Sequence, residues 1–297
     1  WLHVVVTESP EWLTLHGDYL MAEEIQNNLA KEYNRQNRGN PVKLLNKLDL
    51  AMAYQESSEK FRFKDFLREN YWKQTLMGAT LQLLVQFSGI NILMYYIIFI
   101  CDMIGLEGTV RIVSASIPYM INSALSLLPI TFMDHVRRKD ITLAGGFPLG
   151  IIMVAIGTLM GINGHKVEPI NGNKSLVWVV DRNTGPLVMG LCFLFVAVFS
   201  VTLSCGPWIY TNELLPTKAR AKGLPICMSI GWLANFSLTL LGPTMLASLK
   251  WRTFVLLGAI TLAISIAILV FFPDTKDLSQ IEIDSLYLKL DIKDKGY

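Results

Sequence analysis

Residues 183–212 have the sequence NTGPLVMGLCFLFVAVFSVTLSCGPWIYTN, thirty consecutive positions without a charged side chain. About 20 apolar residues of helix cross the roughly 30 Å hydrocarbon core of a bilayer, so this stretch is long enough to span a membrane. Five more stretches lack Asp, Glu, Lys and Arg, and each has 21 or more residues: 74–101, 112–133, 141–164, 223–249 and 253–273. The sequence therefore predicts an all-α membrane protein with six transmembrane helices.

The composition agrees with a membrane protein. Of the 297 residues, 52% are hydrophobic and only 17% are charged, and the mean hydropathy is +0.40. All 26 basic and 24 acidic side chains lie outside the six uncharged stretches. This pattern does not fit a soluble domain or a secreted disulfide scaffold, and a net charge of +2 indicates no polyanionic partner, so no nucleic acid is expected.

The loops between the stretches differ in basic residues. Loops 134–140 and 213–222 lie on one side of the predicted membrane and carry six Lys or Arg in seventeen positions. The opposite loops 102–111, 165–182 and 250–252 carry six in 31 positions. Because basic residues are enriched in cytoplasmic loops, both ends of the chain are expected in the cytoplasm.

Three regions follow along the chain. Residues 1–73 are interpreted as the end of a preceding span, with its last apolar turn at 1–6, followed by a cytoplasmic linker of short helices such as 18–32. Residues 74–273 form the predicted six-helix bundle, and residues 274–297 form a polar cytoplasmic tail.

Cysteines and histidines show no sign of a metal site. The four cysteines lie inside or at the end of uncharged stretches and are interpreted as small buried thiols: Cys101, Cys192, Cys205 and Cys227. The four histidines have no ligand spacing, so no metal or other cofactor is predicted. The loop 165–182 contains the sequon Asn173-Lys174-Ser175, which makes Asn173 a candidate for glycosylation.

The first span contains amides that are costly in lipid unless they are paired. Asn91 follows Gln86 by five positions, about 140° around an ideal helix. The two side chains can meet only if the helix deforms, and Gly89 between them is a suitable place. The alternative to a binding role is that such amides form hydrogen bonds between helices of the bundle.

Further polar and aromatic residues occur in the other spans. Asn122 and Asn235 are buried amides of the second and fifth spans, and Trp232 lies one turn before Asn235. Trp208 lies near the end of the fourth span, where an anchor at the membrane–water interface is the alternative to a ligand-binding role. Uncharged amides with indoles suit a neutral polyhydroxylated ligand, because amides bond hydroxyls and an indole covers the apolar face of a ring.

Gly89 and six prolines are expected to interrupt the helices: Pro118, Pro129, Pro148, Pro207, Pro225 and Pro243. Broken helices are typical of transporters, although kinking for packing explains the pattern equally well.

Charged residues repeat at equivalent span ends. The second span ends in Asp134, followed by Arg138 and Lys139, and the fourth ends in Glu213, followed by Arg220. Charges beside a membrane often mark topology alone. The repeated pattern of an acid followed by bases favours loops that pair across an interface, through bonds of about 0–1 kcal/mol that suit a reversible gate.

These motifs together resemble the signatures of the sugar porters of the major facilitator superfamily, and the loop before Trp178 most resembles that of fungal high-affinity glucose (hexose) transporters. The matching strings are ESPEWL (8–13), QFSGIN (86–91), DHVRRK (134–139), WIYTNE (208–213), PTKARAKG (216–223) and PDTK (273–276). The resemblance covers about residues 7–284. It implies that this chain is the C-terminal half of a twelve-span fold, whose partner is a missing N-terminal half of six helices.

The resemblance also implies roles for individual residues. The positions that match the family's substrate-binding residues are Gln86, Asn91, Asn122, Trp208, Trp232 and Asn235. Tyr95 and Tyr96 match the outer gate, and the residues that match the inner gate are Asp134, Arg138, Lys139, Glu213 and Arg220.

The chain departs from the family pattern at several of these motifs. Val85 replaces one of a pair of glutamines, Arg137 replaces a glycine that ends a tight loop, and Ser204-Cys205 replaces a Gly-Pro pair before Trp208.

The predicted function is transport of a monosaccharide, glucose first, across the lipid bilayer of the plasma membrane by alternating access. Proton symport and facilitated diffusion both stay open. The alternatives are a sugar sensor, disfavoured by the short tail of 24 residues, and a truncated remnant that does not transport. An enzyme is not predicted, because no nucleophile–base pair occurs in the spans.

Overall fold

A computed structural model of the chain describes residues 8, 10–36, 71–133, 135–167, 178–215 and 217–275. The chain divides into two compact units, Trp1–Arg62 and Phe63–Tyr297. In the first unit, α2 (Pro10–Leu15) packs against α3 (Tyr19–Gln36), and Gly17 turns the chain between them with φ of +83°. The helix expected at 18–32 is confirmed by α3.

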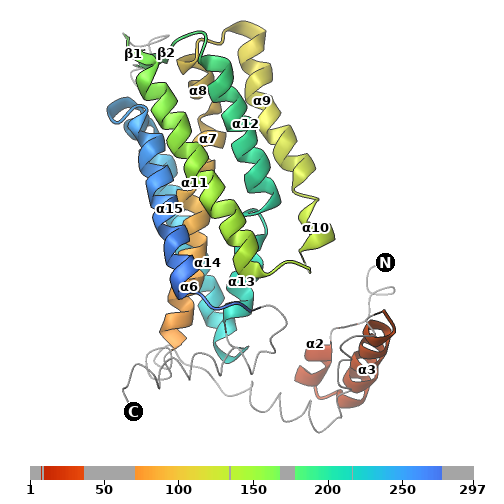
Figure 1. Cartoon of the computed structure of the whole chain (residues 1–297). Coiled ribbons are helices and arrows are strands. Elements are labelled where there is room, and N and C mark those ends of the chain that lie inside the picture. The colour runs from red at the N-terminus through yellow and green to blue at the C-terminus, as the bar shows by residue number, and fades with distance from the viewer. Residues whose placement is uncertain are drawn as a thin grey trace. The chain divides into compact units, whose positions relative to one another are not determined.

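The second unit confirms the six predicted spans. Its helical segments that are long and apolar enough to cross a membrane are Tyr71–Tyr95, Gly108–Phe132, Arg138–Ile162, Gly185–Leu214, Ala219–Ser248 and Arg252–Phe271. Figure 1 shows them side by side as one bundle.

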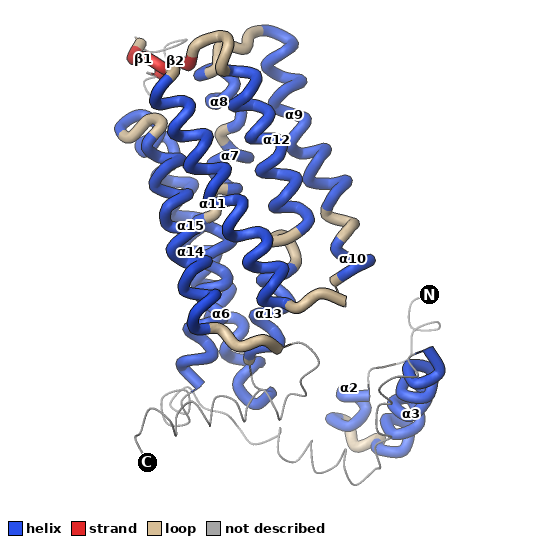
Figure 2. The backbone as a smooth tube through the Cα atoms, in the orientation of Figure 1, coloured by secondary structure: helices blue, strands red, loops and turns tan. Residues whose placement is uncertain are grey.

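Three of these spans consist of more than one helix, as the tube in Figure 2 shows. The first contains α6 (Tyr71–Phe87) and α7 (Ile90–Tyr95) and continues into α8 (Ile97–Met103). The second contains α9 (Gly108–Leu125) and α10 (Pro129–Phe132), and the fourth contains α12 (Gly185–Val201) and α13 (Gly206–Leu214). The remaining spans are single helices: α11 (Arg138–Ile162), α14 (Thr217–Ser248) and α15 (Arg252–Phe271).

The helix breaks only partly follow the prolines. Gly89 breaks the first span as expected, with φ of +93°. Pro129 and Pro207 lie at the starts of α10 and α13, where a missing N–H costs little. The interruptions expected at the other prolines are wrong, because α9, α11 and α14 continue through them: Pro118, Pro148, Pro225 and Pro243. A spanning helix tolerates proline where neighbouring groups bond the backbone atoms that it leaves unpaired.

The helices α11 and α15 pack along each other. Gly157 faces Val255 so closely that a Cβ atom on the glycine would lie 2.6 Å from Val255 Cγ2. Gly150 similarly faces Leu262, where the corresponding distance is 2.7 Å. Small residues allow helix backbones to approach each other, so these glycines set the distance between the two spans.

A short hairpin covers one end of the bundle. β1 (Gly164–Lys166) and β2 (Trp178–Val180) pair antiparallel, and the Trp178 indole N–H donates to the carbonyl of Met160 at 2.8 Å. We call this the hairpin end and the opposite end, where α11 begins, the Arg138 end (Figure 1). Asn173 lies outside the described residues.

Candidate functional site

The break in the first span brings two amides together. Gln86 lies in the last turn of α6, and Asn91 lies in the first turn of α7. The left-handed conformation of Gly89 redirects the chain between them, and Asn91 Nδ2 donates to Gln86 Oε1 at 2.5 Å. The deformation expected at Gly89 is therefore confirmed, and it places both side chains on one side of the span.

A third amide joins them from another helix. Asn235 on α14 donates through Nδ2 to the same Gln86 oxygen at 3.1 Å. Gln86 is only 8% exposed, whereas Asn91 and Asn235 are half-buried. An amide has two N–H donors and one carbonyl oxygen, so beyond these two bonds Gln86 keeps both donors and Asn91 keeps its acceptor. We call Gln86, Asn91 and Asn235 the amide cluster.

Asn122 has a different partner. Its Oδ1 lies 2.8 Å from the hydroxyl of Ser200, which is fully buried on α12. This contact joins α9 to α12, two helices that pack along each other. The structure thus brings three of the four amides together and pairs the fourth with a serine that the sequence did not single out.

The two tryptophans predicted to bind the ligand, Trp208 and Trp232, are exposed in the second unit. Trp232 is 62% exposed and lies one turn before Asn235 on α14. Trp208 is 39% exposed and lies in the first turn of α13, directly after the turn 202–205. Val85, which replaces an amide of the family pattern, is buried in the hydrophobic core instead.

Tyrosine hydroxyls bond backbone carbonyls toward the hairpin end. Tyr96, between α7 and α8, donates to the carbonyl of Thr239 on α14 at 2.6 Å. Tyr119 of α9 donates to the carbonyl of Met94 at 2.7 Å. The neighbouring Tyr95 is exposed.

An ion pair joins the first residue of α11 to the last turn of α13 at the Arg138 end. Arg138 Nε donates to Glu213 Oε1 at 2.9 Å, with the side chains only 14% and 31% exposed. The hydroxyl of Thr275 donates to the other Glu213 oxygen at 3.0 Å. The expected pairing of loops is confirmed for Arg138 and Glu213, whereas Asp134 lies outside the described residues and Arg220 donates to the nearby carbonyl of Leu215.

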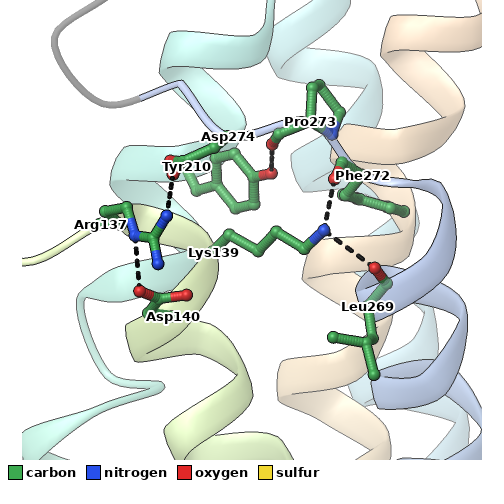
Figure 3. Close-up of polar contacts among 8 residues, drawn as sticks. All are labelled: Arg137, Lys139, Asp140, Tyr210, Leu269, Phe272, Pro273 and Asp274. Carbon is green, nitrogen blue, oxygen red and sulfur yellow. Dashed lines mark hydrogen bonds and ion pairs between the residues drawn. The ribbon is translucent and has the colours of Figure 1, made fainter.

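Figure 3 shows how the end of α15 is held there. Lys139 Nζ donates to the carbonyls of Leu269 and Phe272, each at 2.8 Å, and the buried Tyr210 donates through its hydroxyl to the carbonyl of Pro273. Lys139 thus bonds backbone rather than a carboxylate. No sequence signal indicated these contacts, because their acceptors are main-chain atoms.

Arg137 contributes to the same end of the bundle (Figure 3). Its guanidinium donates to Asp140 at 2.7 Å and pairs with Asp274 at 3.3 Å. The hydrogen bond to Asp140 and the two carboxylate charges raise the pKa of Arg137 above its usual value. With φ of −66° and ψ of 135°, Arg137 adopts ordinary extended backbone, so the position does not require the family's glycine here.

The described residues contain no group of three or more His, Cys, Asp or Glu that could hold a metal ion. The amide cluster and the exposed indoles instead provide uncharged hydrogen-bonding groups beside flat apolar surfaces. This arrangement suits a neutral polar ligand.

The family described as "Sugar (and other) transporter" matches residues 1–287. The chain belongs to this family. It is a multi-pass membrane protein with the six-helix, C-terminal half of the major facilitator fold.

Curated relatives of this sugar transporter family member are about twice its length. A Saccharomyces cerevisiae protein named "Probable metabolite transport protein" is 46% identical over 282 residues, which are 94% of this chain and 52% of that protein. The "High-affinity glucose transporter" of Kluyveromyces lactis is 26% identical over 287 residues, 95% of this chain and 52% of that protein. The chain therefore spans about half the length of the curated relatives it matches.

Solved structures share the fold. A double tryptophan mutant of XylE matches with a TM-score of 0.66 at 22% identity, over 95% of this chain and 55% of that one. The proton:xylose symporter XylE bound to 6-bromo-6-deoxy-D-glucose matches with a TM-score of 0.63 at 21% identity, over the same shares of the two chains.

Proposed function

We propose that this chain is the sugar-binding half of a monosaccharide transporter, with glucose as the first candidate substrate, that works by alternating access. The observation that carries the proposal is the amide cluster, in which two spans direct amides to the single oxygen of Gln86. A sugar hydroxyl both donates and accepts hydrogen bonds, so it is matched by the N–H groups of Gln86 and the oxygen of Asn91. The relatives named as glucose transporters support this substrate class.

The indoles complete the proposed site. Trp232 is one turn from Asn235, so its ring is close enough to cover the C–H face of a sugar held by the amide. Trp208 on α13 and Asn122 on α9 are included in the proposed site because they match the family's substrate-binding positions. The site uses no metal or cofactor.

A second six-helix half is the proposed partner. In the most apolar windows of the spans Gly108–Phe132 and Ala219–Ser248, only 17% of residues are buried, against 67% in Tyr71–Tyr95. The exposed face of α14, in the span Ala219–Ser248, carries Trp232 beside Asn235. A polar site of this kind does not suit contact with lipid. Covering both helices with a second half would enclose the site between two bundles.

The same proposal places the Arg138 end in the cytoplasm and the hairpin end outside the plasma membrane. The Arg138–Glu213 pair, with Lys139 and Arg220 nearby in the sequence, would act at the inner gate, and Tyr95 and Tyr96 would act at the outer gate. Residues 1–73 would then be the end of a preceding span and a cytoplasmic linker, 74–273 the bundle and 274–297 the tail.

Uptake of radiolabelled glucose tests the proposal. The chain is co-expressed with a first six-span half in yeast cells that lack hexose transporters. Asn91→Ala and Asn235→Ala should each lower uptake at low glucose roughly 3- to 10-fold at equal surface expression, because each removes one hydrogen-bonding group. Asn163→Ala is the matched control, because this amide caps the far end of α11 and should leave uptake unchanged.

Other outcomes separate the alternatives. Unchanged uptake in both site variants would rule out the amide cluster as the sugar site. Glucose binding without any uptake would identify a sensor, and uptake by the chain expressed alone would contradict the need for a second half. A loss of uptake when the proton gradient is collapsed would add a proton as a second substrate.

A further inference from the structure

Pro243 leaves a backbone carbonyl inside a span without its helical donor. In an α-helix, the carbonyl of a residue accepts from the N–H four positions later, and proline has no N–H. α14 continues through Pro243, so the carbonyl of Thr239 lacks that bond. Within a membrane, an unpaired backbone group costs several kcal/mol, so a different donor is required.

The donor comes from the first span. The Tyr96 hydroxyl lies 2.6 Å from the Thr239 oxygen, a distance typical of a strong O–H···O bond. The proline of one span therefore creates an acceptor that the tyrosine of another span fills.

Gly242 permits the tyrosine to reach this carbonyl. A Cβ atom on Gly242 would lie 2.4 Å from Tyr96 Cε2 and 3.1 Å from its hydroxyl oxygen. A carbon–carbon contact of 2.4 Å does not occur, so a side chain at position 242 would displace the ring of Tyr96. Gly242 and Pro243 are adjacent in sequence, and one supplies the space while the other supplies the acceptor.

Tyr96 lies where two short helices of the first span meet. α7 has six residues and α8 has seven, and the backbone departs from helical geometry at Gly89 before α7 and at Tyr96 between them. On the opposite flank, Tyr119 donates to the carbonyl of Met94 in this segment. Two tyrosine hydroxyls thus hold the segment 90–103 between α9 and α14.

Thr239 of α14 also contacts the amide cluster. The Thr239 hydroxyl lies 3.4 Å from Asn235 Oδ1, and Asn235 donates to Gln86. A change at the amide cluster can therefore reach Tyr96 through one residue.

We propose that Gly242 and Pro243 are positioning residues that dock Tyr96 on the Thr239 carbonyl, and that this hydrogen bond, the Tyr96 latch, sets whether the segment 90–103 is held against α14. The latch requires no ligand. Its further role, transmission of sugar binding from Asn235 to the segment, rests on the proposed function.

Hydrogen–deuterium exchange of the purified chain in lipid nanodiscs tests the latch. Tyr96→Phe should raise the exchange rate of the amides of 97–103 roughly 3- to 10-fold, the loss expected for one hydrogen bond. Pro243→Ala gives position 243 an N–H that can donate to the carbonyl of Thr239 in place of the Tyr96 hydroxyl. This variant should produce a similar rise in the exchange rate. The double variant should exchange no faster than the Tyr96→Phe single variant, because both changes remove the same bond.

Matched variants separate the latch from general loosening of the bundle. Pro148→Ala removes a proline from α11 and should leave the exchange of 97–103 unchanged. Gly242→Ala should reproduce the effect of Tyr96→Phe, whereas Gly190→Ala, where an added Cβ meets nothing within 4 Å, should not. Additive effects of Tyr96→Phe and Pro243→Ala, or unchanged exchange in Tyr96→Phe, would overturn the latch.

Glucose distinguishes failure of the latch from failure of the proposed function. If sugar acts through Asn235, saturating glucose should change the exchange of 97–103 in the unmodified chain co-assembled with the first six-span half, and not in Tyr96→Phe assembled in the same way. No glucose effect together with a non-additive cycle would keep the latch and reject its link to sugar.

Discussion

Asn235 donates a hydrogen bond to Gln86 at 3.1 Å although the two residues are 149 positions apart in the sequence. Because Asn91 donates to the same oxygen, a single buried acceptor holds together the two parts of the first span and the fifth span. This geometry makes Gln86 important for stability as well as for the proposed site.

Gln86→Leu should lower the free energy of unfolding by about 1–3 kcal/mol, because it leaves two amide donors without their acceptor. Asn235→Leu should cost less, since Gln86 then keeps the bond from Asn91. The double variant should be less destabilised than the sum of the two single variants. Thermal unfolding in detergent measures this cycle, and strict additivity would show that the contact contributes nothing.

The glycines of α11 provide a second prediction. Gly157→Ala places a Cβ atom 2.6 Å from Val255 Cγ2 and 2.9 Å from the backbone oxygen of Trp251, so α11 and α15 must separate. The expected loss is about 1–3 kcal/mol, as for other overpacked sites.

Gly190→Ala on α12 is the matched control for that loss. An added Cβ there meets nothing within 4 Å, and alanine has the higher helix propensity, so the unfolding temperature should stay equal or rise. Equal destabilisation by Gly157→Ala and Gly190→Ala would show that contact with α15 is not the cause.

Lys139 should control the fraying of α15. Its ammonium group donates to the carbonyls of Leu269 and Phe272, which have no donors of their own in the helix end. Lys139→Met should speed hydrogen exchange in the last turn of α15, and Lys139→Arg should largely restore protection. Lys166→Met, in the exposed strand β1, is the control and should leave that turn unchanged.

Arg137→Gly should be nearly neutral. Arg137 pairs with Asp140 and Asp274 at the protein surface, where ion pairs contribute about 0–1 kcal/mol and are screened by salt. The variant should lower the unfolding temperature slightly at low salt and not at 1 M salt. A large loss at both salt concentrations would mean that Arg137 has a role beyond these pairs.

Much of the fold could be predicted from the sequence. The six spans follow from uncharged stretches of sufficient length, and the break at Gly89 follows from the residue type between two amides. That the segments around Arg138 and Glu213 pair could be inferred because an acid and bases recur at equivalent span ends, whereas the specific ion pair came from the structure. Each of these inferences depends on local sequence.

The contacts of individual polar groups could not be predicted in the same way. The partner of Asn122 is Ser200, one of many serines, and the partners of Tyr96 and Lys139 are backbone carbonyls, which every residue has. Pro243 was expected to interrupt its helix, but α14 continues through it, and a tyrosine from another span bonds the carbonyl that the proline leaves without its helical donor.

The sequence alone determined that this protein crosses a membrane as helices, because the hydrocarbon core requires about 20 apolar residues in each span, and that requirement acts on every stretch separately. The tertiary structure decided which amides share an oxygen and which carbonyl receives a tyrosine. Those partners lie on different spans, and only the packing of helices against one another brings them within the 3 Å or so that a hydrogen bond needs.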